Sequence, residues 1–313
     1  MNMVLDNSGR HLWRQCHLKY KFKTIDGVQS RKGSTALRYG SAWHGFKEAF
    51  YRTILTEGWE AKRYAMLNGI GFAKDVWEKE SENREFYDDY RTFDNLCSAA
   101  MKWLDYYPED ENELEVIGTE KIFELEMMPL TEEEAEWWHS PPESLLFTGR
   151  IDLQIKIHGI PWIVDTKTTG NSLAVESNRL GRSAQFMGYS YAAEKILDFK
   201  PNGCLVDYLH TSGRKNKDGD YGTIKYDFAR VPHIFTDKDL LSWRFSFLRA
   251  AKEIQEAMLS GLWDQCQDSC YDFNRNCGFL GVCEQNKQEV DLAQNESFIY
   301  LPWDVREAVK GVE

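Results

Sequence analysis

Two acidic residues and a lysine lie in the stretch GRIDLQIKIHGIPWIVDTKTT, whose short runs of β-branched and aromatic residues predict two strands joined by a loop. Because successive side chains of a strand point to opposite faces, Asp152, Asp165 and Lys167 would share one face of this hairpin. With HGIP as the loop, the predicted register pairs Ile157 with Trp162, Asp152 with Lys167, and Gln154 with Asp165. The opposite face is apolar and belongs in a core: Ile151, Leu153, Ile155, Trp162 and Val164.

Two carboxylates on the half-buried side of a sheet attract a hard divalent cation. Mg²⁺ or Mn²⁺ held by Asp152 and Asp165 would polarise a phosphodiester and lower the pKa of a bound water. Lys167 would then orient that water or stabilise negative charge in the transition state. The alternative is a surface ion pair between Asp165 and Lys167 with Asp152 in solvent, and the short D-x-K pattern alone favours this alternative.

The elements around this hairpin are expected to alternate between helices and strands. A helix starting at Ser41 would bury Trp43, Phe46, Phe50 and Ile54, with His44 beside this apolar stripe. A second helix is expected over 72–106, a helix carrying Gln185 and Tyr189 follows the hairpin, and another runs from a capping box at Thr236 to Ser260. Further strands are expected in LEVIGTEKIFELEM, GCLVDYLH and GTIKYDFARV, and the acidic segment TEEEAEWWHSPPE is expected to be a solvated insertion.

Seven cysteines are present, and four of them, Cys266, Cys270, Cys277 and Cys283, crowd one irregular loop near the C-terminus. Thiolates that converge in such a loop would be held by zinc or by an iron–sulfur cluster, because both accept four cysteine ligands. Cys97 and Cys204 lie in a predicted helix and an apolar strand and are expected to be buried thiols.

The 313 residues carry a net charge of −12, which argues against a nonspecific nucleic-acid coat, but the charge is unevenly distributed. Between Arg10 and Arg38 there are eight Lys or Arg and one acid, whereas Asp105 to Glu143 holds fourteen acids and one base. Any polyanion would therefore meet the N-terminal segment. The chain has no apolar run long enough for a signal peptide or a membrane span, so we expect a cytoplasmic protein with no membrane partner.

The order of these motifs resembles the PD-(D/E)XK nuclease superfamily. Within it, the chain is most similar to the RecB-like branch, which includes AddB-type recombination nucleases and CRISPR-associated iron–sulfur exonucleases. The similarity lies in GRID, a short hairpin, VDTK and then Gln185-x-x-x-Tyr189, in this order. His44 and the basic opening LWRQCHLKYKF extend the resemblance from Leu12 to Cys283. The resemblance implies an α/β fold: a restriction-endonuclease-like core with a central mixed sheet flanked by helices. It divides the chain into an N-terminal helical region (1–113), a nuclease core (114–232) and a C-terminal helix with a cysteine-cluster loop (233–313).

The resemblance also assigns roles to individual residues. His44, Asp152, Asp165 and the carbonyl of Thr166 would be metal ligands, and Lys167 would be catalytic. Gln185 and Tyr189 would line the DNA path, although core packing of Tyr189 with Phe186 is the alternative. Glu120 matches an acid that some members use near the metal, with Glu124 and Glu126 as rivals.

The same branch carries a [4Fe-4S] cluster with one N-terminal and three C-terminal cysteines, and this set maps onto Cys16, Cys270, Cys277 and Cys283. The gaps between the last three cysteines depart from the usual close Cys-x-x-Cys pair, so Cys266 in place of Cys270, and zinc in place of iron, stay open.

The resemblance implies a Mg²⁺- or Mn²⁺-dependent DNA exonuclease that acts on single-stranded DNA or DNA ends in recombination, repair or CRISPR-adaptation-like processing. Basic residues that flank Cys16 (Arg10, Arg14, Lys19, Lys21 and Lys23) would gather the DNA, and the loop with Arg214, Lys215 and Lys217 is expected to be solvated. The alternatives are a structure-specific endonuclease, or a catalytically idle DNA-binding or adaptor subunit of a helicase or of a recombination or integration complex.

Overall fold

The computed structural model of the protein describes residues 2–82, 84–87, 89–128, 130–272 and 275–302. It forms two compact units, each assembled from separate stretches of the chain. Unit 1 comprises Met1–Arg31, Ile122–Gly149 and Lys238–Glu313, and unit 2 comprises Lys32–Lys121 and Arg150–Asp237. The three consecutive regions expected from the sequence stay a prediction.

A mixed β-sheet forms the centre of unit 2. Its strands are β5 (Ile160–Thr169), β6 (Cys204–Ser212) and β7 (Lys225–His233), with the unit 2 parts of β3 (Leu114–Glu126) and β4 (Ser144–Ile157). The order is β4-β5-β6-β7, with β3 also paired to β4. Strands β5 and β6 are parallel, whereas β4 with β5 and β6 with β7 are antiparallel.

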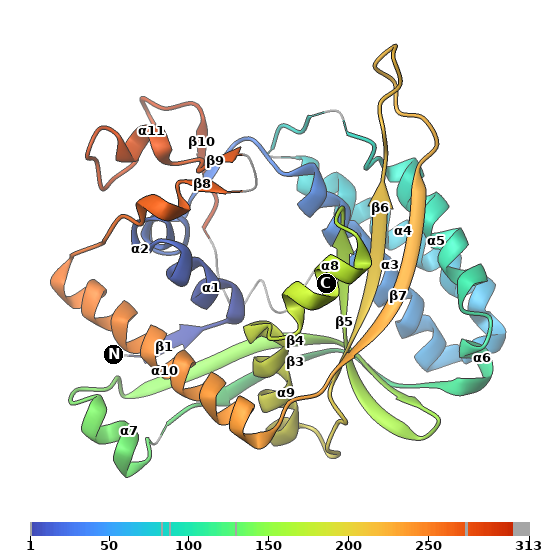
Figure 1. Cartoon of the computed structure of the whole chain (residues 1–313), viewed down its shortest axis with the longest axis horizontal. Helices are drawn as coiled ribbons and strands as arrows, with labels where there is room; N and C mark the ends of the chain where they lie inside the picture. Colours follow the sequence, from blue (N-terminus) through green and yellow to red (C-terminus); the bar gives the residue numbers. More distant parts are fainter. Residues whose placement is uncertain (1, 83, 88, 129, 273–274, 303–313) are drawn as a thin grey trace. The chain divides into compact units, whose positions relative to one another are not determined.

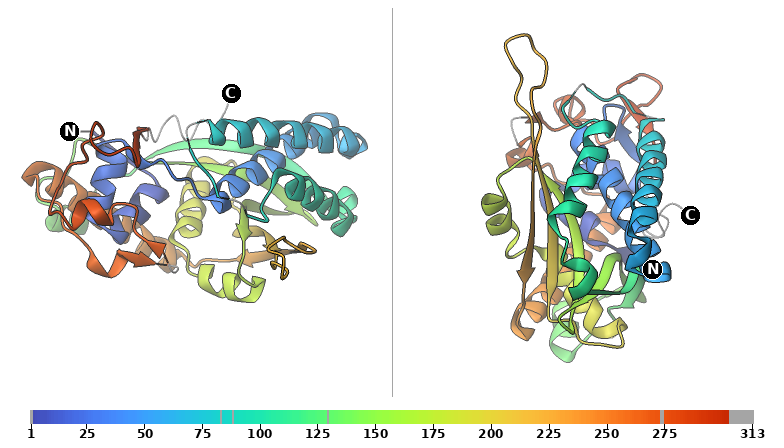
Figure 2. Two further views of the ribbon diagram at one scale, coloured as in Figure 1. Left: turned by 90° about the horizontal axis from the view of Figure 1, so that it is seen from above. Right: turned by 90° about the vertical axis from the view of Figure 1, so that its right-hand side faces the viewer.

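Helices cover both faces of this sheet. Helices α3 (Thr35–Glu57), α4 (Lys62–Ser81) and α5 (Phe93–Tyr106) lie on one side of the strands and α8 (Leu173–Leu180) on the other (Figures 1 and 2). Short α6 (Asp110–Glu113) precedes β3, and α9 (Ala184–Ile196) connects α8 to β6. The expected α/β fold with a mixed central sheet flanked by helices is therefore confirmed.

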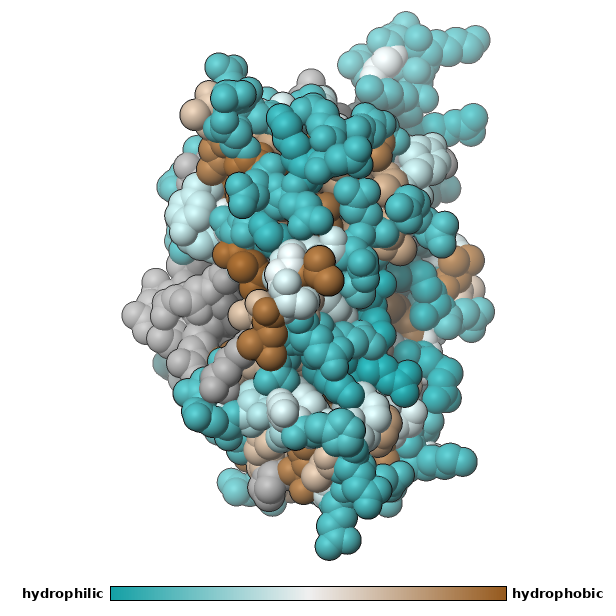
Figure 3. Space-filling model, turned by 90° about the vertical axis from the view of Figure 1, so that its left-hand side faces the viewer, coloured by the Kyte–Doolittle hydropathy of each residue, from teal (hydrophilic) through white to brown (hydrophobic). Residues whose placement is uncertain are grey.

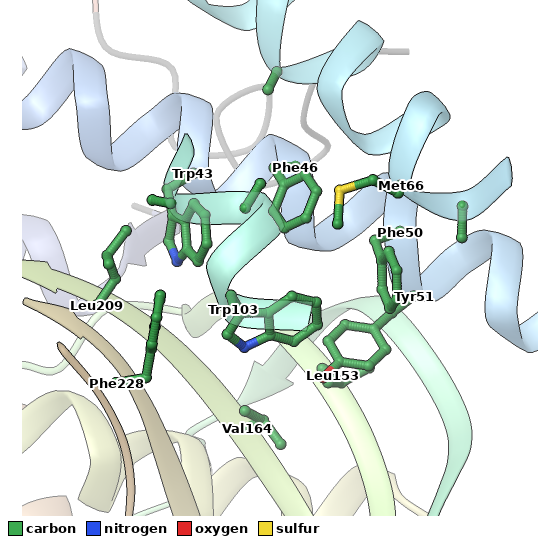
Figure 4. Packing of buried hydrophobic residues seen from close by; sticks show 14 of the residues in the cluster. Trp43, Phe46, Phe50, Tyr51, Met66, Trp103, Leu153, Val164, Leu209 and Phe228 are labelled. Atoms are coloured by element: carbon green, nitrogen blue, oxygen red, sulfur yellow. The ribbon is translucent and has the colours of Figure 1, made fainter. Parts of the chain in front are cut away.

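The core of unit 2 lies between α3, α5 and the sheet. Trp43, Phe46 and Phe50 of α3 are fully buried, and Trp103 of α5 packs edge-on against all three rings. The opposite side of this cluster is formed by strand residues that include Leu153 and Val164 (Figure 4). The predicted apolar stripe is thus correct, and it fixes α3 on the sheet.

Two helix boundaries in this unit were predicted wrongly. Helix α3 begins two turns before Ser41, because Ser34 accepts a hydrogen bond from the Leu37 N–H and caps it. The helix expected over 72–106 is two helices, α4 and α5, and Thr92 caps the second by accepting from the Asn95 N–H.

The hairpin register also differs from the prediction by two residues. His158 and Gly159 both have positive φ, 50° and 79°, which is the backbone of a two-residue hairpin turn. The loop is therefore only two residues long, and Ile157 pairs with Ile160 instead of Trp162. Since side chains alternate with a period of two, a shift of two residues leaves every side chain on its predicted face.

Unit 1 contains both ends of the chain. Its N-terminal stretch forms β1 (Asn2–Leu5), α1 (Asn7–Gln15), α2 (His17–Tyr20), a π-helical turn (Lys21–Ile25) and β2 (Val28–Ser30). Strand β1 runs parallel to Ser144–Phe147 of β4, and β2 pairs with β10 (Phe298–Tyr300). The N-terminal region was expected to be wholly helical, so these two strands correct that expectation.

The long helix α10 (Asp237–Ser260) ends at Gly261, as predicted, with a φ of 72° at this glycine. After α10 come a 3-10 turn (Gln267–Ser269), the short strands β8 (Tyr271–Asp272) and β9 (Arg275–Asn276), and α11 (Leu280–Cys283).

The acidic segment after β3 is solvated only in part, since Glu132, Glu133 and Glu136 are exposed whereas Glu134 and Trp138 are buried. It forms α7 (Glu132–Trp137), which Thr131 and Glu134 begin with a reciprocal capping box. Glu134 is buried and accepts a hydrogen bond from Arg244 Nε at 2.8 Å, and Trp138 donates to Gln255 at 2.9 Å. These contacts are made by partners more than a hundred residues away in α10.

The face of the molecule shown in Figure 3 is mostly hydrophilic, with a small group of hydrophobic residues. None of the described helices is long and apolar enough to cross a membrane.

Candidate active site

The two acids of the hairpin lie where strands β4 and β5 stop pairing. The last backbone pair on this side is Leu153 with Val164, and Asp152 and Asp165 are the next residues on each strand. Instead of meeting a β4 carbonyl, the Thr166 N–H donates to Asp152 Oδ2 at 3.0 Å. The separation of the strands thus lets a carboxylate take the place of a backbone acceptor.

His44 approaches Asp152 from helix α3. Its Nδ1 lies 3.1 Å from Asp152 Oδ2, and the Asp152 side chain is only 15% exposed. Burial would raise the pKa of Asp152, but His44, Lys167 and the Thr166 N–H outweigh it and lower this pKa to about 2. Asp152 is therefore ionised at neutral pH.

Asp165 is held from two directions and is 2% exposed. Lys167 Nζ lies 2.7 Å from its Oδ2, and Gln185 of α9 donates to its Oδ1 at 3.1 Å. Burial raises the pKa of Asp165, and the Asp152 carboxylate adds to the increase against the opposing charge of Lys167. The ion pair between Asp165 and Lys167 exists, but the burial of both acids excludes the surface alternative in which Asp152 is solvated.

Lys167 remains protonated at this position. Burial would lower the pKa of its ammonium group, but Asp165 and Asp152 outweigh burial and raise it. The side chain is 27% exposed, so its positive charge is close to both acids and still accessible.

A third acid, Glu120, lies beside Asp152, and its backbone is unusual. Its φ is 49°, a left-handed value that is strained for a non-glycine residue, and its carboxylate is 2.6 Å from Arg150 Nε. Burial and then the Asp152 charge raise the pKa of Glu120 to about 9, despite Arg150. The rivals Glu124 and Glu126 are exposed, and Glu126 accepts from Ser144 and the Leu145 N–H in unit 1.

Two neighbours of the acids were not anticipated from the sequence. Arg150, in the GRID motif, pairs with Glu120, and Glu48 lies one turn after His44 on α3. Burial raises the pKa of Glu48, which also interacts with the charges of Arg150 and Asp152. The i, i+4 spacing of Glu48 from His44 was the available signal, because it places both side chains on the same side of a helix.

Tyr189 lies one helical turn beyond Gln185 in α9 and is half-buried. The neighbouring Phe186 is fully buried, tilts against His233 and lies 5.9 Å from Lys167 Nζ. The structure thus brings together His44, Glu120, Asp152, Asp165, Thr166, Lys167 and Gln185, and it places Tyr189 on the same helix as Gln185.

The donor set fits a divalent metal ion. Carboxylate oxygens with one imidazole suit Mg²⁺ or Mn²⁺, and Glu120 Oε2 and Asp165 Oδ2 are buried, each facing one cation without a well-oriented hydrogen bond. Within the described part of the chain, no three His, Cys, Asp or Glu side chains already form a metal-binding group.

The predicted cluster cysteines all lie in unit 1. Cys16 separates α1 from α2, and its Sγ lies 3.9 Å from the Asp264 carbonyl, to which the Leu18 N–H also donates. Cys270 and Cys277 flank the β8–β9 hairpin, where the Cys277 N–H donates to the Cys270 carbonyl at 2.7 Å. Cys283 ends α11.

Electrostatic interactions link the same four thiols. Burial raises the pKa of Cys283 to about 11, and the neighbouring Cys277, Cys16 and Cys270 thiols add to the increase. Cys266 acts on Cys270, and its own Sγ lies 3.6 Å from Ser269 Oγ. The choice between a set with Cys270 and one with Cys266 stays a prediction.

Several residues of the expected basic edge already have acidic or polar partners in unit 1. Arg14 lies 3.4 Å from Glu253, Lys21 lies 2.7 Å from Asp26, and Arg10 donates to Ser246. The two ion pairs reduce the net positive charge of the N-terminal segment.

A family model for the PD-(D/E)XK nuclease superfamily matches residues 8–284. The chain belongs to this superfamily. Among solved structures, this PD-(D/E)XK protein is similar to a candidate exonuclease from Eubacterium rectale, with 13% identity, a TM-score of 0.45 and coverage of 99% of this chain and 94% of the other. It is also similar to SSO0001, with 9% identity, a TM-score of 0.27 and coverage of 79% and 84%. A comparison with curated protein sequences gave no significant match.

Proposed function

We propose that this PD-(D/E)XK protein is a metal-dependent DNA exonuclease that acts on single-stranded DNA or on DNA ends. The observation that carries the proposal is the convergence of two largely shielded acids, Asp152 and Asp165, with a charged lysine, Lys167, and an imidazole, His44. The superfamily match supports nuclease chemistry at this site.

His44, Asp152, Asp165 and the Thr166 carbonyl would hold Mg²⁺ or Mn²⁺, with Glu120 beside them. When bound, the cation would polarise the scissile phosphate and lower the pKa of the attacking water. Since metal binding favours ionised ligands, Glu120 would lose its proton as the site fills.

The protein side chains then supply position and charge. Lys167 is held as an ammonium group by Asp165, so it stabilises the extra negative charge of the transition state and does not act as a general base. Gln185 fixes the orientation of Asp165 from α9, and Tyr189, on the same helix, would stack against a base of the substrate strand.

A [4Fe-4S] cluster bound by Cys16, Cys270, Cys277 and Cys283 is part of the same proposal. The proximity of these four thiols in unit 1 supports it. Phosphodiester hydrolysis transfers no electrons, so the cluster would act as a structural link between the N-terminal segment and the loop after α10.

The function is tested with one labelled single-stranded DNA sequence in linear and in circular form, each incubated with Mg²⁺, with Mn²⁺ or with EDTA. An exonuclease degrades the linear form only, and only with metal. Opening of the circle indicates an endonuclease, and no cleavage of either form with metal indicates an idle DNA-binding subunit. Either result contradicts the proposal.

A further inference from the structure

A buried ion pair lies next to the acid site and has no part in the chemistry described above. Lys47 Nζ of α3 lies 2.6 Å from Asp207 Oδ2 of β6, and the two side chains are only 5% and 4% exposed. The pair therefore joins the helix to the sheet away from solvent.

Both members lie close to residues of the acid site, Lys47 along a helix and Asp207 across the sheet. Lys47 follows His44 by three residues, so it lies about one turn along the same helix. Asp207 pairs across the parallel ladder with Thr166, and its neighbours Val206 and Tyr208 pair with Asp165 and Lys167. The ion pair thus connects the element that carries His44 to the strand beside Asp165 and Lys167.

The surroundings restrict where the ammonium group can lie. Lys47 Nζ is 3.5 Å from the centre of the Trp103 ring and 5.1 Å from that of Tyr51, and these rings belong to the core of unit 2 (Figure 4). A cation held over an aromatic face and bonded to a carboxylate has a narrow choice of positions.

A second buried pair fixes the carboxylate. Arg230 of β7 makes two bonds to Asp110, at 2.5 and 2.6 Å, and its Nε lies 3.7 Å from Asp207 Oδ2. The Tyr51 hydroxyl lies 3.4 Å from the same guanidinium group. Two acids and two bases therefore form a neutral group among α3, α6, β6 and β7.

Stability alone does not explain such a pair. Replacing a buried ion pair by apolar side chains of similar volume is often neutral or stabilising, because the desolvation of two charges offsets their attraction. An ion pair differs from an apolar contact in its directionality, which fixes the distance and orientation of the two elements it joins.

We propose that Lys47 and Asp207 are positioning residues that set the placement of His44 relative to Asp165 and Lys167, and that they thereby set the metal affinity of the site. This inference rests on the proposed function. It predicts that loss of the pair weakens metal binding although neither residue touches the metal.

The test uses the full chain with both partners replaced, Lys47→Met together with Asp207→Leu, so that no charge is left buried alone. The matched control is Arg244→Met with Glu134→Gln, which removes a buried ion pair in unit 1 and keeps an oxygen for the cap of α7. Mn²⁺ affinity is measured by calorimetry without DNA, and thermal unfolding is followed by circular dichroism. Nuclease activity against Mn²⁺ concentration is a third measurement.

We expect the Lys47 and Asp207 double variant to stay folded and to bind Mn²⁺ about tenfold more weakly, the lower end of the loss seen when a hydrogen-bonded partner of a metal ligand is removed, because the pair acts on His44 only through the placement of α3. The control variant should keep its Mn²⁺ affinity within about twofold, at a similar change in melting temperature. Unchanged Mn²⁺ affinity in the folded double variant overturns the inference.

If the double variant does not fold, Asp207→Asn takes its place, since it keeps the shape of the side chain and an acceptor for Lys47. Unchanged Mn²⁺ affinity in this folded variant then overturns the inference. Absence of Mn²⁺ binding by the unchanged chain contradicts the proposed metal site itself. The two failures can be told apart. If only the positioning role is wrong, the unchanged chain still binds Mn²⁺ and cleaves DNA.

Discussion

Removal of the Cys16 thiol should remove the proposed ligand link between the N-terminal segment and the loop after α10. Cys16 would be the only cluster ligand from the N-terminus, and about 250 residues separate it from Cys270. In the chain-entropy description, a cross-link that closes a loop of this length stabilises the folded state by about 5 kcal/mol. At roughly 2 °C per kcal/mol for a chain of this size, Cys16→Ser should lower the melting temperature by about 10 °C.

The assay compares anaerobically purified variants by visible absorption, by iron and sulfide content and by thermal unfolding. Cys16→Ser, Cys270→Ser, Cys277→Ser and Cys283→Ser should each lose the brown colour. Cys266→Ser is the matched control because it lies in the same loop, and it should keep both colour and melting temperature.

Three results would refute this reasoning in different ways. If Cys266→Ser alone loses colour while Cys270→Ser keeps it, the ligand set is wrong. If the unchanged protein is colourless and carries stoichiometric zinc, the iron–sulfur assignment fails and the link between the chain ends remains. If Cys16→Ser has the same melting temperature as the unchanged protein, the N-terminal segment is not held by a ligand at all.

Three further changes test other parts of the account. His44→Ala should weaken Mn²⁺-dependent cleavage less than loss of a carboxylate does, because water replaces one neutral ligand readily. If His44→Ala instead unfolds the protein and its folded fraction keeps the Mn²⁺ affinity, the histidine is purely structural. Gly69→Ala should destabilise unit 2 by about 1–3 kcal/mol in urea unfolding, because the new Cβ would lie 2.8 Å from the Phe46 carbonyl oxygen, and an unchanged midpoint would contradict this packing. Burial would raise the pKa of Glu134, but Arg244 and the Thr131 N–H outweigh it and lower this pKa, so the stability advantage of the unchanged protein over Arg244→Met should begin to shrink as pH falls below about 4.5 and should be lost once Glu134 is protonated in the folded state. An advantage that does not depend on pH anywhere in the acid range would contradict the pair.

The sequence predicted which residues share the acid site better than it predicted their register. Alternation alone places Asp152, Asp165 and Lys167 on one face, and the observed two-residue shift preserves that result. The error came from the turn, because a left-handed His158 before Gly159 is less common than the Asn-Gly pair that marks such turns.

Contacts between distant segments were beyond what the sequence could indicate. Nothing in the acidic run of α7 distinguishes the buried Glu134 from its exposed neighbours until Arg244, over a hundred residues later, is placed against it. In the same way, the partnership of Lys47 with Asp207 depends on the placement of a helix on a parallel strand pair. The left-handed backbone of Glu120 could not be predicted either, since no residue in EKIFELE marks it as different from the neighbouring acids.

The central claim is that Asp165 and its neighbours form a metal-dependent nuclease site, and the rate of Mn²⁺-dependent cleavage of linear single-stranded DNA by Asp165→Asn tests it most directly. This change keeps the size of the side chain and an acceptor for Gln185, and removes the charge together with the oxygen that faces Lys167. We expect a loss of at least about a hundredfold in cleavage with the fold retained, by analogy with the loss of one electrostatic contact in an active site. Cleavage by folded Asp165→Asn at the rate of the unchanged protein would contradict the assignment of this site.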